Sequence, residues 1–258
     1  MKEYLDFAIE IAEYAKKEML ENFNHLGAVE FKEDRTTVTE VDKRINHYLI
    51  ERVHEKYPEH GVLGEEESSE KKNKQLWVCD PVDGTGMFTD GVPVSVFSLA
   101  YVVDGEVQVG VVLDPYLNNL YTAIRGEGAY CNGEKIHVNS KKVGDLGYRL
   151  NFEMWDQSHY NTFAMVEELL PVVRISCIGS VARSAMAIAS GNFSCDLFPG
   201  VEHGNCDIAA SSLIVEEAGG KVTDFYGKKQ RYDGEIRGAI ISNGTSHEEI
   251  LQRVQKYL

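Results

Sequence analysis

The sequence predicts an α+β fold in which helices pack on mixed and antiparallel sheets. Three observations support this class. Apolar residues recur at three-to-four spacing near the N-terminus, which is the period of an amphipathic helix. Residues 94–138 consist of short strand-forming runs separated by tight turns, whereas the second half alternates strand-like and helix-like segments. The run of adjacent strands indicates an antiparallel meander rather than a βαβ array.

Two amphipathic helices are predicted first. The earlier one covers roughly residues 2–24, and the later one begins near Val41, after the polar, extended stretch 32–38. The second helix ends before Pro58, because the residue ahead of a proline disfavours helical backbone angles. Asp42 lies in the first turn of this helix, where the helix dipole stabilises a carboxylate.

The central segment of the chain is an apolar run at 76–79, which has the length of a short buried strand. Asp80 follows it, and Pro81 is expected to stop the strand because proline cannot donate a ladder hydrogen bond. Asp83-Gly84-Thr85-Gly86 then forms a tight turn, which in many proteins is only a surface feature. Here it places two carboxylates, a hydroxyl and several backbone N–H groups at one strand end. These groups suit Mg²⁺ and a phosphate together.

The meander of the first half contains strands at 94–103 and 106–113, joined by Asp104-Gly105, which is a strong hairpin signal. Strands at 120–125 and 129–138 continue it, and Asn132-Gly133 interrupts the last one. A further short strand at 62–64 is expected before the acidic run that begins at Glu65.

The second half is predicted from the same signals. Its strands are expected at 148–152, 172–177, 193–198, 221–224 and 238–242, and its helices at 160–170, 181–190 and 207–218. Gly219-Gly220 ends the third of these helices, and Ser246 is expected to cap a last one. Because there is no long linker, residues 1–258 are expected to form one domain, with halves of about 1–140 and 141–258.

Composition and charge exclude several classes of protein. The 258 residues carry a formal net charge of −15, which repels nucleic acid and anionic membranes. No segment approaches the ~20 apolar residues of a membrane span, and acidic residues stand where a signal peptide would be basic. Five cysteines without a Cys-x-x-Cys pair argue against a disulfide framework and a zinc site. We therefore expect a cytoplasmic protein without nucleic-acid or membrane partners.

Three segments, taken in order, resemble a known family. They are Gly64-Glu65-Glu66, Asp80-Pro81-Val82-Asp83-Gly84-Thr85, and Asp207-Ile208-Ala209-Ala210 with its continuation to Gly220. Together they resemble the inositol monophosphatase family of Mg²⁺-dependent, lithium-sensitive phosphatases, and the likeness covers essentially the whole chain. The resemblance implies a layered α/β/α/β/α sandwich, with the site between the two halves. It also implies a homodimer.

The resemblance assigns a role to individual residues. It implies two or three Mg²⁺ per site, held by Glu65, Asp80, Asp83, Asp207 and the Val82 carbonyl. Thr85, hydrogen-bonded toward Asp42, would orient and activate a water molecule, and Glu65 would share in catalysis. The phosphate would be held by the backbone N–H groups of Gly84 and Thr85, and the organic part of the substrate by Gly179 and Ser180. Glu202 is the nearest candidate for an acid that contacts a substrate hydroxyl.

The sequence departs from the family pattern at three places. Gly86-Met87 stands where the family has Thr-Asn, Cys206 stands where it has Trp, and segment 199–205 matches no subfamily pattern. Asp207 alone could be an ordinary helix cap, and Cys206 could be a packing residue or a thiol beside the metals. The departures lie on the substrate side rather than among the carboxylates, so the identity of the substrate stays open.

The predicted function is Mg²⁺-dependent hydrolysis of a small phosphate monoester by metal-activated water, with an inositol phosphate-like polyol or a sugar phosphate as substrate. Alternative substrates are histidinol phosphate, a 3′-phosphonucleotide or a sugar bisphosphate. A different class is a non-catalytic sensor of a phosphorylated ligand. Only the Gly86-Met87 departure favours the sensor, whereas the retained carboxylates and Thr85 favour the enzyme.

Overall fold

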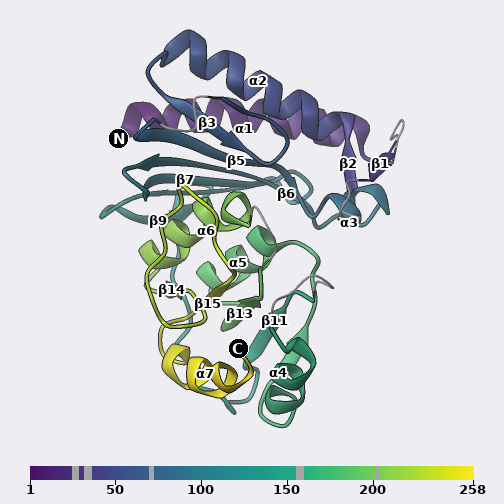
Figure 1. Cartoon of the computed structure of the whole chain (residues 1–258), viewed down its shortest axis with the longest axis vertical. Helices are drawn as coiled ribbons and strands as arrows, with labels where there is room; N and C mark the ends of the chain where they lie inside the picture. The colour runs from purple at the N-terminus through teal and green to yellow at the C-terminus, as the bar shows by residue number, and fades with distance from the viewer. Residues whose placement is uncertain (25–28, 32–36, 70–72, 155–159, 201–203) are drawn as a thin grey trace.

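Helices and sheets alternate in five layers, in the order helix, sheet, helix, sheet, helix (Figure 1). The computed structural model describes residues 1–24, 29–31, 37–69, 73–154, 160–200 and 204–258. The five layers confirm the layered sandwich that the family resemblance implies.

The first helical layer consists of α1 (Lys2–Asn22) and α2 (Glu40–Lys56), which lie on one face of the larger sheet (Figure 1). Both predicted amphipathic helices are confirmed. α1 buries Phe7, Ile11, Ala15 and Met19, one for each turn. Trp77 of the sheet meets this face, with its ring 4.9 Å from that of Phe7. Each large apolar side chain buried in this way contributes about 1.5–3 kcal/mol.

The larger sheet has eight strands in the order β10-β9-β8-β7-β6-β5-β3-β4, in which only the β3–β5 pair is parallel. Its strands are β3 (Gly61–Gly64), β4 (Ser68–Ser69), β5 (Gln75–Asp83), β6 (Val96–Val103), β7 (Glu106–Asp114), β8 (Asn119–Ile124), β9 (Gly128–Cys131) and β10 (Glu134–Lys135). The predicted meander is confirmed as β6 to β9. The turn at Asp104-Gly105 has φ values of 49° and 84°, which fits a two-residue hairpin that needs two left-handed residues.

The prediction that Pro81 ends the central strand was wrong, because β5 continues to Asp83. Asp80 pairs with Ser98, and Asp83 pairs with Val96. An interval of three residues on β5 therefore lies opposite an interval of two residues on β6. This extra residue is a β-bulge, where a proline without an N–H is tolerated. The bulge also breaks the alternation of side chains that would otherwise send Asp80 and Asp83 to opposite faces.

The middle layer contains α5 (Val181–Ala189) and α6 (Asn205–Glu217), which pack between the two sheets (Figure 1). The smaller sheet has the order β12-β11-β13-β15-β14. Its strands are β11 (Arg149–Phe152), β12 (Arg174–Ser176), β13 (Cys195–Phe198), β14 (Lys221–Thr223) and β15 (Ala239–Ser242). α4 (Thr162–Leu169) and α7 (His247–Val254) form the outermost layer, and a short 3₁₀ turn (Gln255–Tyr257) follows α7.

The core around α5 and α6 draws on both halves of the chain, for instance Val78 and Ile241. The single-domain organisation of 1–258 stays a prediction, which one calorimetric unfolding transition would support.

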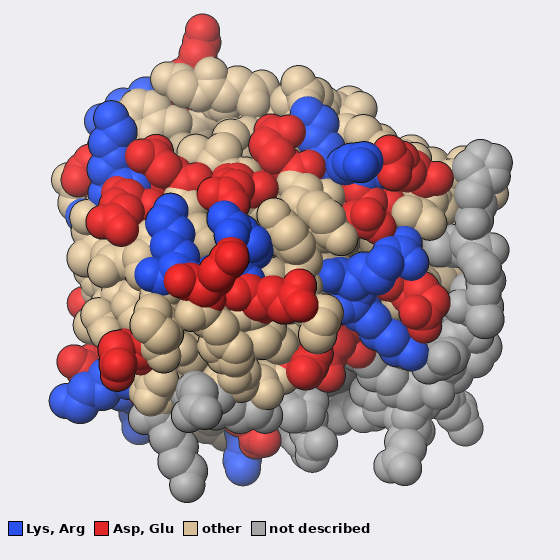
Figure 2. Space-filling model, turned by 90° about the horizontal axis from the view of Figure 1, so that it is seen from above, with Lys and Arg blue, Asp and Glu red and all other residues tan. Residues whose placement is uncertain are grey.

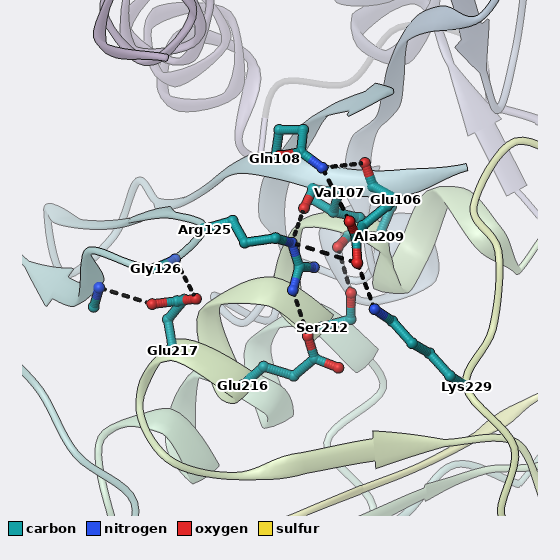
Figure 3. Close-up of polar contacts among 11 residues, drawn as sticks. Glu106, Val107, Gln108, Arg125, Gly126, Ala209, Ser212, Glu216, Glu217 and Lys229 are labelled. Atoms are coloured by element: carbon teal, nitrogen blue, oxygen red, sulfur yellow. Dashed lines mark hydrogen bonds and ion pairs between the residues drawn. The ribbon is translucent and has the colours of Figure 1, made fainter. Parts of the chain in front are cut away.

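α6 is fixed tightly to the larger sheet. A Cβ added to Gly110 of β7 would lie 2.7 Å from the Ala210 carbonyl oxygen, so only glycine allows this close approach. At the C-terminal end of α6, the Glu217 carboxylate accepts hydrogen bonds from the N–H groups of Gly126 (2.7 Å) and Gly128 (2.8 Å). Arg125 forms an ion pair with the neighbouring Glu216 (Figure 3). The opposite end of α6 carries Asp207, whose position is therefore tied to the first sheet.

Three local features differ from the sequence-based prediction. Ser246 does precede α7, but its hydroxyl donates to Asn243 Oδ1 (2.9 Å) instead of capping the helix. The ribbon of β1 (Val29–Phe31) and β2 (Thr37–Thr39) and the short helix α3 (Thr85–Thr89) were not predicted. No helix in the described part of the chain has the length and apolar character needed to span a membrane.

Candidate metal and phosphate site

Asp42 uses its two carboxylate oxygens for different partners. Oδ2 accepts from the N–H (2.9 Å) and the hydroxyl (2.5 Å) of Thr39, which completes a capping box at the start of α2. Oδ1 accepts from the Thr85 hydroxyl at 3.2 Å. Asp42 was expected to stabilise the start of α2, and the family resemblance implies that it contacts Thr85. The side chain makes both contacts, one through each oxygen.

The environment of Asp42 is buried and negative. The side chain has no solvent exposure. Burial raises its pKa to about 7, the bonds from Thr39 oppose that rise, and the Glu65 carboxylate adds to it. The Thr85 hydroxyl that reaches Asp42 also lies 2.8 Å from the Val82 carbonyl oxygen. Since a hydroxyl has one hydrogen, Asp42 and Val82 compete for it.

Acids from the two halves of the chain surround Asp80 closely enough for their charges to act on it. Asp80 is only 2% exposed, and its Oδ1 accepts from the Val82 N–H at 3.0 Å. Burial raises the pKa of Asp80 well above its usual range, and the charges of Glu65, Asp83 and Asp207 raise it further. A bound cation would relieve this repulsion.

The donor chemistry of these residues fits Mg²⁺, because carboxylate and carbonyl oxygens are the ligands that this hard ion prefers. In the described residues, however, no three His, Cys, Asp or Glu side chains are grouped closely enough to hold an ion without moving. Glu65 follows β3, and its N–H donates to the Cys79 carbonyl oxygen at 3.1 Å. Its turn is secured by Asn46, whose Nδ2 donates to the Glu67 carbonyl oxygen at 2.8 Å.

Asp83 connects the central strand to the second half. Its carboxylate accepts from the Ser180 hydroxyl (2.5 Å) and from the N–H groups of Ala182 (2.7 Å) and Val181 (3.3 Å) at the start of α5. Burial raises the pKa of Asp83 to about 7, and these hydrogen bonds limit the rise. Asp83 thus has a structural role at the junction as well as the chemistry of a metal ligand.

The turn after Asp83 and the loop before α5 are in direct contact. Gly84 has φ = 87° and forms the N-cap of α3, and a Cβ added there would lie 2.8 Å from the Gly179 carbonyl oxygen. A Cβ added to Gly179 would in turn lie 2.5 Å from Cε of Met87. The structure therefore brings together the four candidates for substrate binding, Gly84, Thr85, Gly179 and Ser180. Glu202, the fifth candidate, lies outside the described residues.

Two departures from the family pattern have a clear structural place. Met87 packs on Gly179, so this departure lies where the turn meets the loop before α5. Cys206 is buried, its thiol lies 3.6 Å from the Leu63 carbonyl oxygen, and burial raises its pKa well above the usual range. Cys206 therefore packs between β3 and α6, and the charges of Asp207, Glu65 and Asp80 also raise its pKa, so it lies beside these acids.

A hollow of about 620 Å³ lies nearby, on the face formed by α1 and α2. It is lined by Tyr14, Lys43, Arg44, His47, Tyr48, Glu51, Glu66 and Glu67. Basic and acidic side chains are interspersed over this face (Figure 2), and several are paired, as Arg44 is with Glu18 at 2.8 Å. None of the candidate site residues lines the hollow, and its mixed charge gives no preference for a phosphate.

The structure also reveals polar residues that the sequence analysis did not select. Asn151, Glu153 and Asp196 are at most 2% exposed and lie beside the loop 177–180. Asp196 stands alone in the apolar strand Cys195–Phe198, and Glu153 directly follows Phe152 of β11. An acid within a short buried strand, as Asp196 is, or directly after one, as Glu153 is, is the signal that could have identified these two residues.

Comparison with known proteins places the chain in one family. The model of the inositol monophosphatase family matches residues 1–258. A fructose-1,6-bisphosphatase/inositol-1-monophosphatase of Thermotoga maritima is 34% identical, over 98% of this chain and 96% of its own length. The structure of an inositol monophosphatase from Thermotoga maritima has a TM-score of 0.87, with 32% identity and coverage of 98% of this chain and 97% of that one. An inositol monophosphatase/NADP phosphatase solved with Mg²⁺ and phosphate has a TM-score of 0.84 at 28% identity, with coverage of 98% and 95%.

Proposed function

Since the chain belongs to the inositol monophosphatase family and is a phosphatase, we propose that it hydrolyses a small phosphate monoester with Mg²⁺ and metal-activated water. One observation carries this proposal most directly. The Thr85 hydroxyl contacts the buried Asp42 carboxylate next to the acids around Asp80. A hydroxyl that reaches a buried carboxylate beside several repelling acids is suited to position a water molecule.

The metal would be held by oxygen ligands from both halves of the chain. The proposed ligands are Glu65, Asp80, Asp83, Asp207 and the Val82 carbonyl, which would hold two or three Mg²⁺. When bound, Mg²⁺ would neutralise charge on the phosphate and lower the pKa of a water molecule. The Mg²⁺ and phosphate in a related solved structure support this choice of ion.

Thr85 and Asp42 would prepare the water for attack. When Thr85 Oγ1 donates its hydrogen to Asp42 Oδ1, its lone pairs are free to accept a hydrogen bond from water. Asp42 thereby orients Thr85, and Thr85 orients the water. Glu65, whose charge also acts on Asp42, would hold the water from a second direction. Together these groups supply positioning and proton transfer.

The substrate would lie across the contact between Gly84 and Gly179. The first N–H groups of a helix have no partner within it, so the start of α3 at Thr85 can receive phosphate oxygens. Gly179 and Ser180 would contact the organic part, and Glu202 would accept a hydrogen bond from a hydroxyl. A polyol or sugar phosphate is the leading substrate, and the name of the Thermotoga maritima relative supports both an inositol phosphate and a sugar bisphosphate. Histidinol phosphate and a 3′-phosphonucleotide remain alternatives.

Phosphate release from a panel of esters tests this proposal. The panel contains inositol 1-phosphate, fructose 1,6-bisphosphate, histidinol phosphate, a 3′-phosphonucleotide and an aryl phosphate. Each is assayed with Mg²⁺, with excess chelator, and with Mg²⁺ plus lithium. We expect Mg²⁺-dependent release from at least one polyol or sugar ester, and inhibition by lithium. Undiminished release in chelator would refute the metal mechanism, and no release from any ester would support the sensor interpretation.

Compartment and assembly are also proposals. All five cysteines are free thiols, which suits a reducing compartment such as the cytoplasm. We propose a homodimer on the basis of family behaviour, and light scattering of the purified protein at several concentrations would test it.

A further inference from the structure

A buried polar group lies just behind the proposed substrate loop. It consists of Asn151, Glu153 and Asp196, whose side chains are 0%, 2% and 0% exposed. β11 and β13 run parallel here, and Asn151 pairs with Asp196 in the register. Two carboxylates buried side by side are costly unless hydrogen bonds compensate them, so they need an explanation beyond packing.

Asn151 joins the two carboxylates. Its Nδ2 donates to Glu153 Oε1 at 2.8 Å and to Asp196 Oδ1 at 3.0 Å. The second Asp196 oxygen accepts from the Ser184 hydroxyl of α5. Burial raises the pKa of Asp196 well above its usual range, and the charge of Glu153 adds to this rise. The group is therefore held by an amide and a hydroxyl, and it faces the loop that leads into α5.

The same group holds the backbone of that loop at consecutive residues. The Ile178 N–H donates to Asn151 Oδ1 at 3.0 Å, and the Gly179 N–H donates to Glu153 Oε1 at 3.1 Å. The Cys177 thiol lies 3.6 Å from Glu153 Oε2. Glu153 and Asn151 thus fix the loop up to the residue before Ser180.

The loop is also held on the side that faces Asp83 and Gly84. Ser180 donates to Asp83 at 2.5 Å, and the Gly179 carbonyl lies so close to Gly84 that an added Cβ would be 2.8 Å away. A shift of Gly179 toward Gly84 would therefore press on Gly84, and a shift that carries Ser180 along would alter its hydrogen bond to Asp83. Gly84 and Asp83 are the residues to which we assign phosphate binding and metal binding.

We propose that Glu153 is a positioning residue of the phosphatase, which sets the Gly179–Ser180 loop against Gly84 and so fixes the phosphate cradle and Asp83. This inference rests on the proposed function. It differs from a purely structural role, because it predicts a change in substrate and metal binding in a protein that remains folded.

Three substitutions separate the possible roles of Glu153. Glu153→Gln keeps an oxygen that can accept from the Gly179 N–H and removes the charge. Glu153→Asp keeps the charge and shortens the reach by one methylene group. Glu153→Ala removes both. If positioning is the role, KM and the Mg²⁺ concentration for half-maximal activity should each rise about tenfold in Glu153→Asp and Glu153→Ala, the effect of one lost hydrogen bond. They should rise much less in Glu153→Gln.

Asn243→Ala is the matched control. The Asn243 amide also bridges two acceptors, Asn139 Oδ1 at 2.9 Å and the Lys141 carbonyl at 2.8 Å, and it is 3% exposed at the end of β15. The Asn243→Ala substitution should lower the melting temperature about as much as Glu153→Ala does. It should leave KM and the Mg²⁺ requirement unchanged. Hydrogen exchange gives a readout that does not depend on activity, because residues 178–182 should exchange faster in Glu153→Asp and Glu153→Ala than in the wild type or the control.

The outcomes are distinct. If Glu153→Ala does not fold, the comparison of Glu153→Asp with Glu153→Gln still decides the role. Unchanged KM, Mg²⁺ requirement and exchange in Glu153→Asp, or equal effects in Asn243→Ala, would overturn the inference. So would a Glu153→Gln variant as impaired as Glu153→Asp. A wild-type protein inactive on every ester would instead refute the proposed function, before any variant is compared.

Discussion

Thr85 and Asp42 are 43 positions apart in the chain, yet Thr85 Oγ1 lies 3.2 Å from Asp42 Oδ1. The two side chains come from the first turns of α3 and α2, which follow and precede β5 in the chain. The other Asp42 oxygen is held by Thr39, so the carboxylate cannot rotate freely. Asp42 therefore presents a fixed acceptor to Thr85.

The first prediction concerns the Thr85 hydroxyl. Thr85→Ala should lower kcat by roughly 10²–10⁴, because a positioned proton-transfer group contributes about that factor. KM should change less, since the backbone N–H groups that bind phosphate are retained. Thr85→Ser keeps the hydroxyl and serves as the control, with activity close to that of the wild type. An unchanged kcat in Thr85→Ala, measured at saturating Mg²⁺, would show that Thr85 is only a turn residue.

The second prediction separates two of the buried acids by their effect on stability without metal. Asp80→Asn removes one of several repelling charges and can keep its bond from the Val82 N–H, so stability should be unchanged or higher. Asp83 accepts three hydrogen bonds. In Asp83→Asn, the NH₂ group of the asparagine would face at least one of the groups that donate to Asp83. Asp83→Asn should therefore cost about 1–3 kcal/mol.

Urea unfolding in chelator measures these stabilities, and Mg²⁺ titration of activity measures the metal site. Both variants should lose activity, whereas the exposed Asp90→Asn at the end of α3 should keep it. Full activity in Asp80→Asn would remove this residue from the metal site. Equal stabilities of Asp80→Asn and Asp83→Asn would mean that the contacts of Asp83 with α5 contribute nothing.

Local sequence patterns predicted most of the helices and strands. They did not predict contacts that depend on which strands are neighbours in a sheet. Apolar periodicity identified α1 and α2, and the run before Asp80 identified β5. The same reasoning stopped β5 at Pro81, because single-strand rules do not include the bulge that pairing with β6 makes possible. α6 begins at Asn205, so Asp207 lies in the first turn instead of at the cap.

The site was only partly accessible from the sequence. The strand end with Asp80 and Asp83 indicated a metal and a phosphate from local chemistry alone. The pairing of Thr85 with Asp42 came from the family resemblance, because nothing local connects residues 43 positions apart. The group around Glu153 was not found, because it depends on β11 and β13 being neighbours in the smaller sheet, and strands separated by a helix do not reveal their order.

The third prediction concerns stability at acidic pH. His247 is fully buried, with Nε2 2.9 Å from the Thr223 hydroxyl and Nδ1 2.8 Å from the Ser242 hydroxyl. Burial lowers its pKa to about 4, and Lys221 adds to this effect. Because the fold favours the neutral ring, its contribution is complete above the ordinary pKa of about 6.5 and is lost as the pH falls toward 4.

Between pH 7 and 4.5 the wild type should therefore lose about 2 kcal/mol more stability than His247→Gln, which cannot titrate. Urea unfolding at several pH values measures the difference. His47→Gln is the control for the loss of a histidine from the surface, since the His47 side chain is 62% exposed on α2. Parallel stability curves for the wild type and His247→Gln would contradict the prediction.

The last prediction uses two glycines that share a backbone conformation and differ in their surroundings. Gly84 has φ = 87° and Gly133 has φ = 81°, so alanine at either position should cost about 1–2 kcal/mol for the left-handed backbone. A Cβ at Gly84 would lie 2.8 Å from the Gly179 carbonyl oxygen and 3.0 Å from Ser180 Cβ, whereas nothing lies within 4 Å of one at Gly133. Gly84→Ala should therefore be the less stable variant, and only this variant should displace the loop that carries Gly179 and Ser180. We expect Gly84→Ala to lose at least about tenfold in kcat/KM, and Gly133→Ala to match the wild type when both are assayed well below their melting temperatures. Equal activity of the two variants would show that the contact between the turn and the loop has no part in catalysis.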